Sequence, residues 1–179
     1  MKTYIALLRG INVGGHRKIL MKDLKDVLHS IGLENCITYI QSGNIVFNSI
    51  ESNTDLIASK ISTEIKKNFN FDVPTIVVTS QELKTIIQEN IYADQELNRL
   101  YYTFLSSAPN KELAIDFSKL KFDNTQSLLK NMGIYIFFDT KSSQSKLSNN
   151  RIEKKLKVNA TTRNWKTMQK LLTITRDFI

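Results

Sequence analysis

Strand-like apolar runs alternate with helix-like apolar spacings through the first half of the chain. Short apolar runs, which are typical of buried strands, occupy residues 2–9, 37–41, 45–47 and 74–79. Apolar residues recur at helical spacing over residues 21–31 and 57–65. Gly43 lies in the short turn between the second and third runs, which predicts a hairpin. The predicted order is therefore β-α-β-β-α-β, and the capping-box pair Thr79 and Glu82 predicts a further helix directly after it.

The second half of the chain repeats this order of elements. Strand-like runs cover residues 100–105, 125–129 and 134–138, and helices are predicted over 112–120 and 149–157. Residues 158–160 predict a stub of a fourth strand, and 163–174 predict a terminal helix. The pattern predicts an α+β protein of two ferredoxin-like α/β plait subdomains, a tandem βαββαβ-type repeat with an extra C-terminal helix. The expected domains are 1–93, the first plait with its following helix, and 98–179, the second plait with basic C-terminal helices.

Charge is distributed unevenly along the 179 residues, whose formal net charge is +8. Residues 141–179 contain 10 Lys and Arg against 2 Asp and Glu, whereas residues 1–140 contain 15 of each. A local excess of cations is suited to an anionic partner such as nucleic acid. The N-terminal apolar stretch is too short for a signal peptide, and no later run is long enough to span a bilayer. The sequence therefore predicts a cytoplasmic protein without a membrane partner.

Several kinds of chemistry are disfavoured by the residues present. The single cysteine, Cys36, is predicted to be a buried core residue, and the two histidines are far apart, so no metal site is expected. Gly10 and Gly15 have the spacing of a phosphate loop, but His16 and Arg17 stand where Lys and Ser or Thr are needed. The chain also lacks a G-x-G-x-x-G pattern. No nucleotide cofactor is therefore expected.

The split β-α-β topology predicts a polar site at one end of the first sheet. The loop after the first strand and the turn between the second and third strands should lie at the same end, because the first two strands run parallel. The candidate ligand-binding residues there are Arg9, Asn12, Gly14, Gly15, Gln41, Ser42 and Asn44, with His16 as a weak candidate for acid-base catalysis. The alternative is that the glycines serve only to allow tight turns.

A second candidate site lies near the C-terminus and consists of Lys146, Thr162, Arg163 and Asn164. Thr161 or Thr162 is a predicted N-cap of the last helix, which places Arg163 in its first turn. The helix dipole disfavours a cation there, so a compensating anion is expected, or alternatively an internal carboxylate. The upstream helix presents the further cations Arg151, Lys154 and Lys155. These cations could line a path for phosphates or could simply be solvated.

Four segments carry a resemblance to a known family: LRGINVGG (8–15), YIQSGN (39–44), SKLSN (145–149) and ATTRNW (160–165). With these motifs in this order, the chain closely resembles the bacterial domain of unknown function 1697 family. The resemblance implies a small cytoplasmic bacterial protein of two α/β plait subdomains, and it brings no established activity, substrate or catalytic residue. One departure is Lys166 before Thr167, where Asn-Thr is common in the family.

The residues support three hypotheses about function. The first is a protein that binds an anionic ligand, either nucleic acid or a phosphorylated metabolite, through its glycine-rich and basic loops. The second is a small enzyme of unknown reaction with its site at the loop from Arg9 to His16. The third is a structural dimer, one form of homo-oligomer, that buries a sheet edge and has no ligand.

Overall fold

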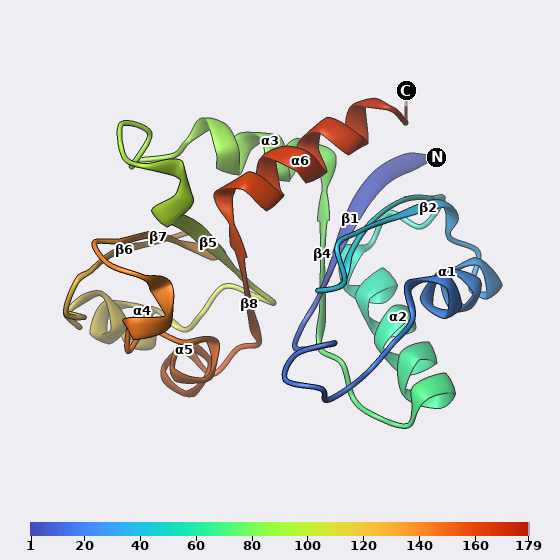
Figure 1. Ribbon diagram of the computed structural model, residues 1–179, viewed down its shortest axis with the longest axis horizontal. Coiled ribbons are helices and arrows are strands. Elements are labelled where there is room, and N and C mark those ends of the chain that lie inside the picture. The colour runs from blue at the N-terminus through green and yellow to red at the C-terminus, as the bar shows by residue number, and fades with distance from the viewer. Residues whose placement is uncertain (179) are drawn as a thin grey trace. The chain divides into compact units, whose positions relative to one another are not determined.

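The computed structural model describes residues 1–178, which divide into two compact units (Figure 1). The first unit comprises Met1–Ile86 together with the chain from Lys170 onward, and the second comprises Ile87–Gln169. Each unit contains a four-stranded antiparallel sheet. The predicted α+β architecture of two tandem ferredoxin-like subdomains and a C-terminal helix is confirmed. The predicted domains, residues 1–93 and 98–179, stay a prediction.

The first unit follows the predicted β-α-β-β-α-β order. Its elements are β1 (Lys2–Leu8), α1 (Met21–Ser30), β2 (Glu34–Tyr39), β3 (Asn44–Ser49), α2 (Thr54–Phe69) and β4 (Thr75–Thr79), and α3 (Ser80–Gln88) follows directly. The strand order is β2-β3-β1-β4, so β1 and β3 form the centre of the sheet. Because β1 and β2 run in the same direction, the connection after β1 and the β2–β3 turn lie at the same end of the sheet.

Both faces of the first sheet are buried, as its continuous apolar strands predict. One face packs on α1 and α2 through residues that include Tyr4, Ala6 and Leu8, and Figure 1 shows both helices on the same side of the sheet. Ile5 and Leu7, which alternate with them along β1, are equally buried on the opposite face. From Tyr4 to Leu8, β1 is therefore buried on both faces of the sheet.

The second unit repeats the topology of the first. Its elements are η1 (Leu97–Arg99), β5 (Leu100–Leu105), α4 (Lys111–Ser118), β6 (Thr125–Lys130), β7 (Gly133–Phe138), η2 (Ser142–Gln144), α5 (Asn149–Leu156) and β8 (Ala160–Asn164). The strand order β6-β7-β5-β8 is equivalent to that of the first sheet. Helices α4 and α5 pack on the face that contains Ile134, Ile136 and Phe138 (Figure 1). The opposite face carries aromatic rings, among them Tyr102 and Tyr135, whose centroids are 4.9 Å apart.

The predicted start of the last helix is wrong. Helix α6 spans Trp165–Arg176, and Arg163 lies in β8, where it pairs with Tyr102 of β5. Neither predicted threonine caps this helix; the Asn164 side chain accepts a hydrogen bond from the Thr167 N–H at 2.8 Å. Residues Ala160 to Asn164 all pair with β5, so backbone groups facing β5 are bonded in the sheet, and the strand extends beyond the predicted stub.

No helix within residues 1–178 is both long and apolar enough to cross a membrane. Across the same described residues, His, Cys, Asp and Glu side chains form no group of three or more that could hold a metal ion.

Candidate functional site

A small hairpin projects from the first sheet directly after β1. The His16 N–H donates to the Val13 carbonyl and the Asn12 N–H donates to the Arg17 carbonyl, both at 3.1 Å. The two residues at the tip, Gly14 and Gly15, have φ angles of 60° and 79°. A two-residue turn with both φ angles positive requires glycine or a similarly permissive residue, and this is the turn that matches the twist of paired strands. These glycines are therefore needed by the backbone of the turn.

Asn12 fixes the base of this hairpin. Its side-chain Oδ1 accepts from the Ile19 N–H at 2.9 Å, and its Nδ2 donates to the carbonyls of Ile19 and Gln41 at 3.0 and 2.9 Å. One amide side chain thus joins both ends of the loop to the β2–β3 turn. The bond to Gln41 confirms that these two segments meet at one end of the sheet. The Asn12 amide is consequently occupied in positioning the loop.

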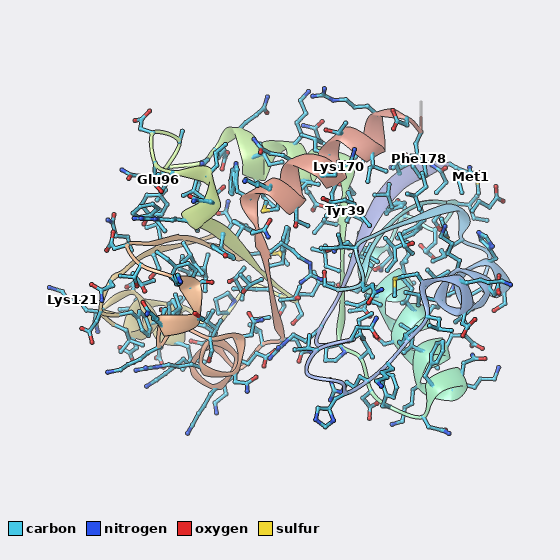
Figure 2. All side chains as sticks on the ribbon, viewed as in Figure 1. Met1, Tyr39, Glu96, Lys121, Lys170 and Phe178 are labelled. Atoms are coloured by element: carbon cyan, nitrogen blue, oxygen red, sulfur yellow. The ribbon has the colours of Figure 1, made fainter. Side chains whose placement is uncertain are left out.

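The β2–β3 turn is held against β1 by its glycine and its asparagine. The Leu8 N–H donates to the Gly43 carbonyl at 2.8 Å, and a Cβ on Gly43 would lie 2.6 Å from the Leu8 Cβ. The buried Asn44 side chain donates to the Tyr39 carbonyl and to the Ser42 hydroxyl, each at 3.0 Å. Tyr39, at the end of β2, is labelled in Figure 2. Gly43 and Asn44 therefore hold the turn in place.

A pocket of about 350 Å³ lies at this end of the first unit. It is lined by Asn12, Gly15, Lys18, Ile19, Leu20, Met21 and Gln41. Lys18 is the charged residue among them, and no carboxylate of the described chain lies within 4.0 Å of its ammonium group. Helix α1 begins at the pocket, where its N-cap residue, Leu20, offers no side-chain hydrogen bond to the first turn. The pocket therefore combines one exposed cation, an uncapped helix start and an apolar wall.

The other predicted residues of this cluster have different positions. Arg9 is half-buried, and its N–H donates to the Pro74 carbonyl at 2.9 Å, so it stands next to the start of β4. Gly14 and His16 are exposed on the hairpin. Of the predicted ligand-binding residues, Asn12, Gly15 and Gln41 line the pocket. The prediction did not include the lining residues Lys18, Leu20 and Met21.

The four residues predicted near the C-terminus do not form one cluster. Thr162 faces α5, where its hydroxyl bonds to Asn149 at 2.6 Å, whereas Arg163 occupies the next position along β8 and points to the other face. Arg163 is 8% exposed, and its Nη1 donates to the Thr161 hydroxyl and the Thr162 carbonyl. Asn164 caps α6. Lys146 is exposed, and its ammonium nitrogen lies 3.7 Å from a carboxylate oxygen of Asp123. Strand alternation separates the motif that looked continuous in the sequence.

The thiol of Cys36 does not contribute a nucleophile. The residue is buried in the core below α1 and α2, and burial raises the pKa of its thiol to about 11. A thiolate is the reactive form, so a high pKa keeps this group inert near neutral pH. The predicted core role of Cys36 is confirmed.

Comparison with known proteins identifies the family of this chain. A family described as a protein of unknown function, DUF1697, matches residues 1–135, which include every residue that lines the pocket. The chain belongs to the DUF1697 family. Among solved structures, this DUF1697 protein is similar to the conserved bacterial protein SP0830 from Streptococcus pneumoniae, with 28% sequence identity and a TM-score of 0.72. That likeness covers 97% of this chain and 98% of the other. No curated protein matches the chain.

Proposed function

We propose that the protein binds a small phosphate-bearing metabolite in the pocket beside Lys18. The observation that carries the proposal is an exposed ammonium group in a preformed pocket, without a neighbouring carboxylate among the described residues. A volume of about 350 Å³ lies within the range of small-molecule sites. The adjacent cation Arg17 is also exposed and also lacks a carboxylate within 4.0 Å in residues 1–178.

The start of α1 adds to the attraction for an anion. The first N–H groups of a helix have no partner within the helix, and here the N-cap side chain provides none. An anion at such a position is stabilised by roughly 0.3 to 1 kcal/mol when exposed. Lys18 supplies a charge-assisted hydrogen bond in addition. Together they favour a phosphate over a neutral group.

Binding is proposed here in preference to catalysis because of the residues that line the pocket. None of the seven is a carboxylate, a histidine or a cysteine. General acid-base chemistry requires a titratable group within hydrogen-bond reach of the reacting atoms. His16 is exposed on the neighbouring hairpin, and an enzymatic role for it stays a prediction.

Titration with inorganic phosphate tests the proposal. Nitrogen-15 spectra of the full chain should show saturable shifts at the amides of Gly15, Lys18 and Gln41. Lys18→Gln should weaken binding about tenfold, since one charge-assisted contact is lost. The matched control is Lys84→Gln, on the exposed face of α3, which follows β4 at the opposite end of the sheet. Shifts that do not saturate, or that respond equally to both substitutions, contradict the proposal.

The basic face of α5 favours nucleic acid as a second candidate ligand. Lys154, Lys155 and Lys157 are exposed there, and the nearby acid Glu153 is engaged by the Ala160 N–H at 2.9 Å. Figure 2 shows long nitrogen-tipped side chains projecting outward around α5. Binding through phosphates alone would be indifferent to sequence and would fall steeply with salt.

Fluorescence anisotropy with a short duplex and a single strand tests this second candidate. Replacing both Lys154 and Lys155 by Gln should reduce the salt slope by about 1.4 to 1.8 if each contacts one phosphate. Replacing Lys111 and Lys121 by Gln, two exposed cations elsewhere in the second unit, is the control. Absent or salt-independent binding of both probes rules out nucleic acid at this face.

A further inference from the structure

Leu20 is an apolar residue at a position that favours a polar one. It is the N-cap of α1 and is 71% exposed. Asn, Asp, Ser and Thr are preferred at N-caps because their side chains accept a hydrogen bond from the first turn, and Leu is among the least favourable choices. Asn53, Asn110 and Ser148 provide such bonds to α2, α4 and α5. Neither helix stability nor burial in the fold accounts for a leucine here.

Ile40 is a second apolar residue that its local structure disfavours. Its φ angle is 50°, in the left-handed region, and its side chain is 50% exposed. A β-branched residue in this region is a conformational outlier, and Asn or Gly would be less strained. Ile40 directly precedes Gln41, which lines the pocket. Strained residues that packing does not explain are concentrated at functional sites, which makes this position informative.

Leu20 lines the pocket, and Ile40 directly precedes Gln41, which lines it as well. The wall of this pocket is also apolar. Ile19, Leu20 and Met21 form a continuous apolar segment beside Lys18. The polar lining is limited, because the Asn12 amide is engaged by Ile19 and Gln41. The side chains of Lys18 and Gln41 make no hydrogen bond or ion pair within the described residues. A ligand with many hydroxyl groups would therefore leave most of them facing hydrocarbon without partners.

We infer that the ligand of this pocket is a phosphate monoester whose organic part is apolar, such as an aryl or alkyl phosphate. This inference rests on the proposed phosphate site and adds the nature of the attached group. The phosphate lies beside Lys18, and the apolar part lies on Leu20 and Met21 with Ile40 at the rim. Ligand contact then accounts for the exposure of Leu20 and for the presence of Ile at a left-handed position.

Calorimetric or spectroscopic titration of the full chain with phenyl phosphate, glycerol phosphate and inorganic phosphate tests the inference. Phenyl phosphate should bind about tenfold or more tightly than inorganic phosphate, because the ring removes apolar surface from water. Glycerol phosphate, with a polar organic part, should bind no better than inorganic phosphate. Equal affinity for phenyl and glycerol phosphates overturns the inference while leaving the phosphate site intact. If none of the three binds, the proposed function itself is wrong.

Substitutions at Leu20 separate ligand contact from helix capping. Leu20→Ala should weaken phenyl phosphate about fivefold and leave inorganic phosphate unchanged, whereas Leu20→Met should retain both affinities. Leu20→Ser supplies a cap and should raise the Tm by about 2 to 4 °C while weakening phenyl phosphate. Ile40→Asn should show the same opposite changes in stability and binding. A parallel loss of both phosphates in Leu20→Ala overturns the inference.

Ile50→Ser provides the control for surface apolarity. Ile50 is 84% exposed and follows β3, so it lies at the end of the sheet away from the pocket. This substitution should leave both affinities unchanged.

Vesicles of phosphatidylglycerol distinguish a soluble phosphate monoester from a membrane headgroup. Binding to these vesicles in a sedimentation assay, without binding of phenyl phosphate, overturns the inference in favour of a lipid surface.

Discussion

The two units share a topology but differ at the sheet end where the first unit has its pocket. Twelve residues separate β1 from α1, whereas five separate β5 from α4. The β2–β3 turn has four residues, and the β6–β7 turn has two. Helix α4 begins with a side-chain cap from Asn110 to the Glu112 N–H at 2.8 Å, while α1 begins with Leu20. The second unit thus shows what this end of the fold looks like with shorter connections and a capped helix start.

The common framework of the two units extends to individual hydrogen bonds. The Leu105 N–H donates to the Met132 carbonyl at 3.0 Å, as the Leu8 N–H donates to the Gly43 carbonyl at 2.8 Å. The Ser106 N–H donates to the Asn159 carbonyl, in the same way as Arg9 to Pro74, with both distances 2.9 Å. The backbone is therefore equivalent up to the ends of the strands. The differences begin in the loops, where binding sites are usually placed.

The largest expected effect on stability distinguishes α6, which follows β8, from α3, which follows β4. Trp165 at the start of α6 is 3% exposed, and its ring centroid lies 6.5 Å from that of Tyr135. Trp165→Ala should lower the free energy of unfolding by roughly 3 to 5 kcal/mol. Ser80→Ala, at the equivalent position of α3, should change it by less than about 1 kcal/mol. Urea denaturation measures both, and similar losses would show that the two helices are equally embedded.

The next effect concerns three hairpin turns, two in the first unit and one in the second. Gly43→Ala should lower the free energy of unfolding by about 2 to 3 kcal/mol, because φ is 78° and the new Cβ would collide with Leu8. Gly15→Ala has a similar φ of 79° but open space, so we expect a loss of about 1 kcal/mol. Met132→Ala, at the matching turn of the second unit, should be close to neutral since Met132 is exposed. Denaturation curves that rank these three differently would contradict the packing described for Gly43.

A smaller effect is expected at the helix starts. Asn110→Ala removes the cap of α4 and should lower the free energy of unfolding by about 1 kcal/mol. Leu20→Ala, at the equivalent start of α1, removes no cap and should change stability little. Thermal unfolding of the two variants provides the comparison. An equal loss at both positions would mean that Leu20 stabilises its helix in another way.

The smallest expected effect is a loss of stability at alkaline pH that comes from the Cys36 thiol in the first unit. The Cys36 thiol has a pKa of about 11 in the folded protein, above its ordinary value of about 9. The unfolded chain loses this proton first as pH rises, so the thiol's contribution to stability is complete below pH 9 and is lost between about pH 9 and 11. At pH 9.5 the loss should be about 0.8 kcal/mol relative to Cys36→Ala. Denaturation of both proteins at pH 7.5 and 9.5 measures this difference, and an identical pH dependence would contradict it.

The sequence was sufficient for the element order, the sheet topology and the meeting of the two loops, because periodicity and split β-α-β connectivity determine them. It placed Arg163 in the wrong element. Threonines before an amphipathic segment are typical of both an N-cap and a strand. Here they form a strand because they pair with β5, a contact between residues far apart in the sequence.

The candidate site was less predictable than the fold. Asn12 looked like a ligand-binding residue, but its amide holds the loop, and a sequence does not indicate which partner a side-chain amide will find. Leu20 was overlooked because apolar residues near a helix start normally contribute to the core. Its 71% exposure is a property of the folded chain and has no signature in the pattern.

Helix α6 has a consequence for the order in which the protein can be made. The first unit includes the chain from Lys170 onward, although its sheet is encoded by the first 79 residues. During synthesis, N-terminal segments leave the ribosome first and begin to fold before the rest is available. This unit therefore obtains its last contacts only after the residues from Lys170 onward have been synthesised. A nascent chain that stalls before Lys170 would leave apolar surface of the first unit exposed and available for chaperone binding.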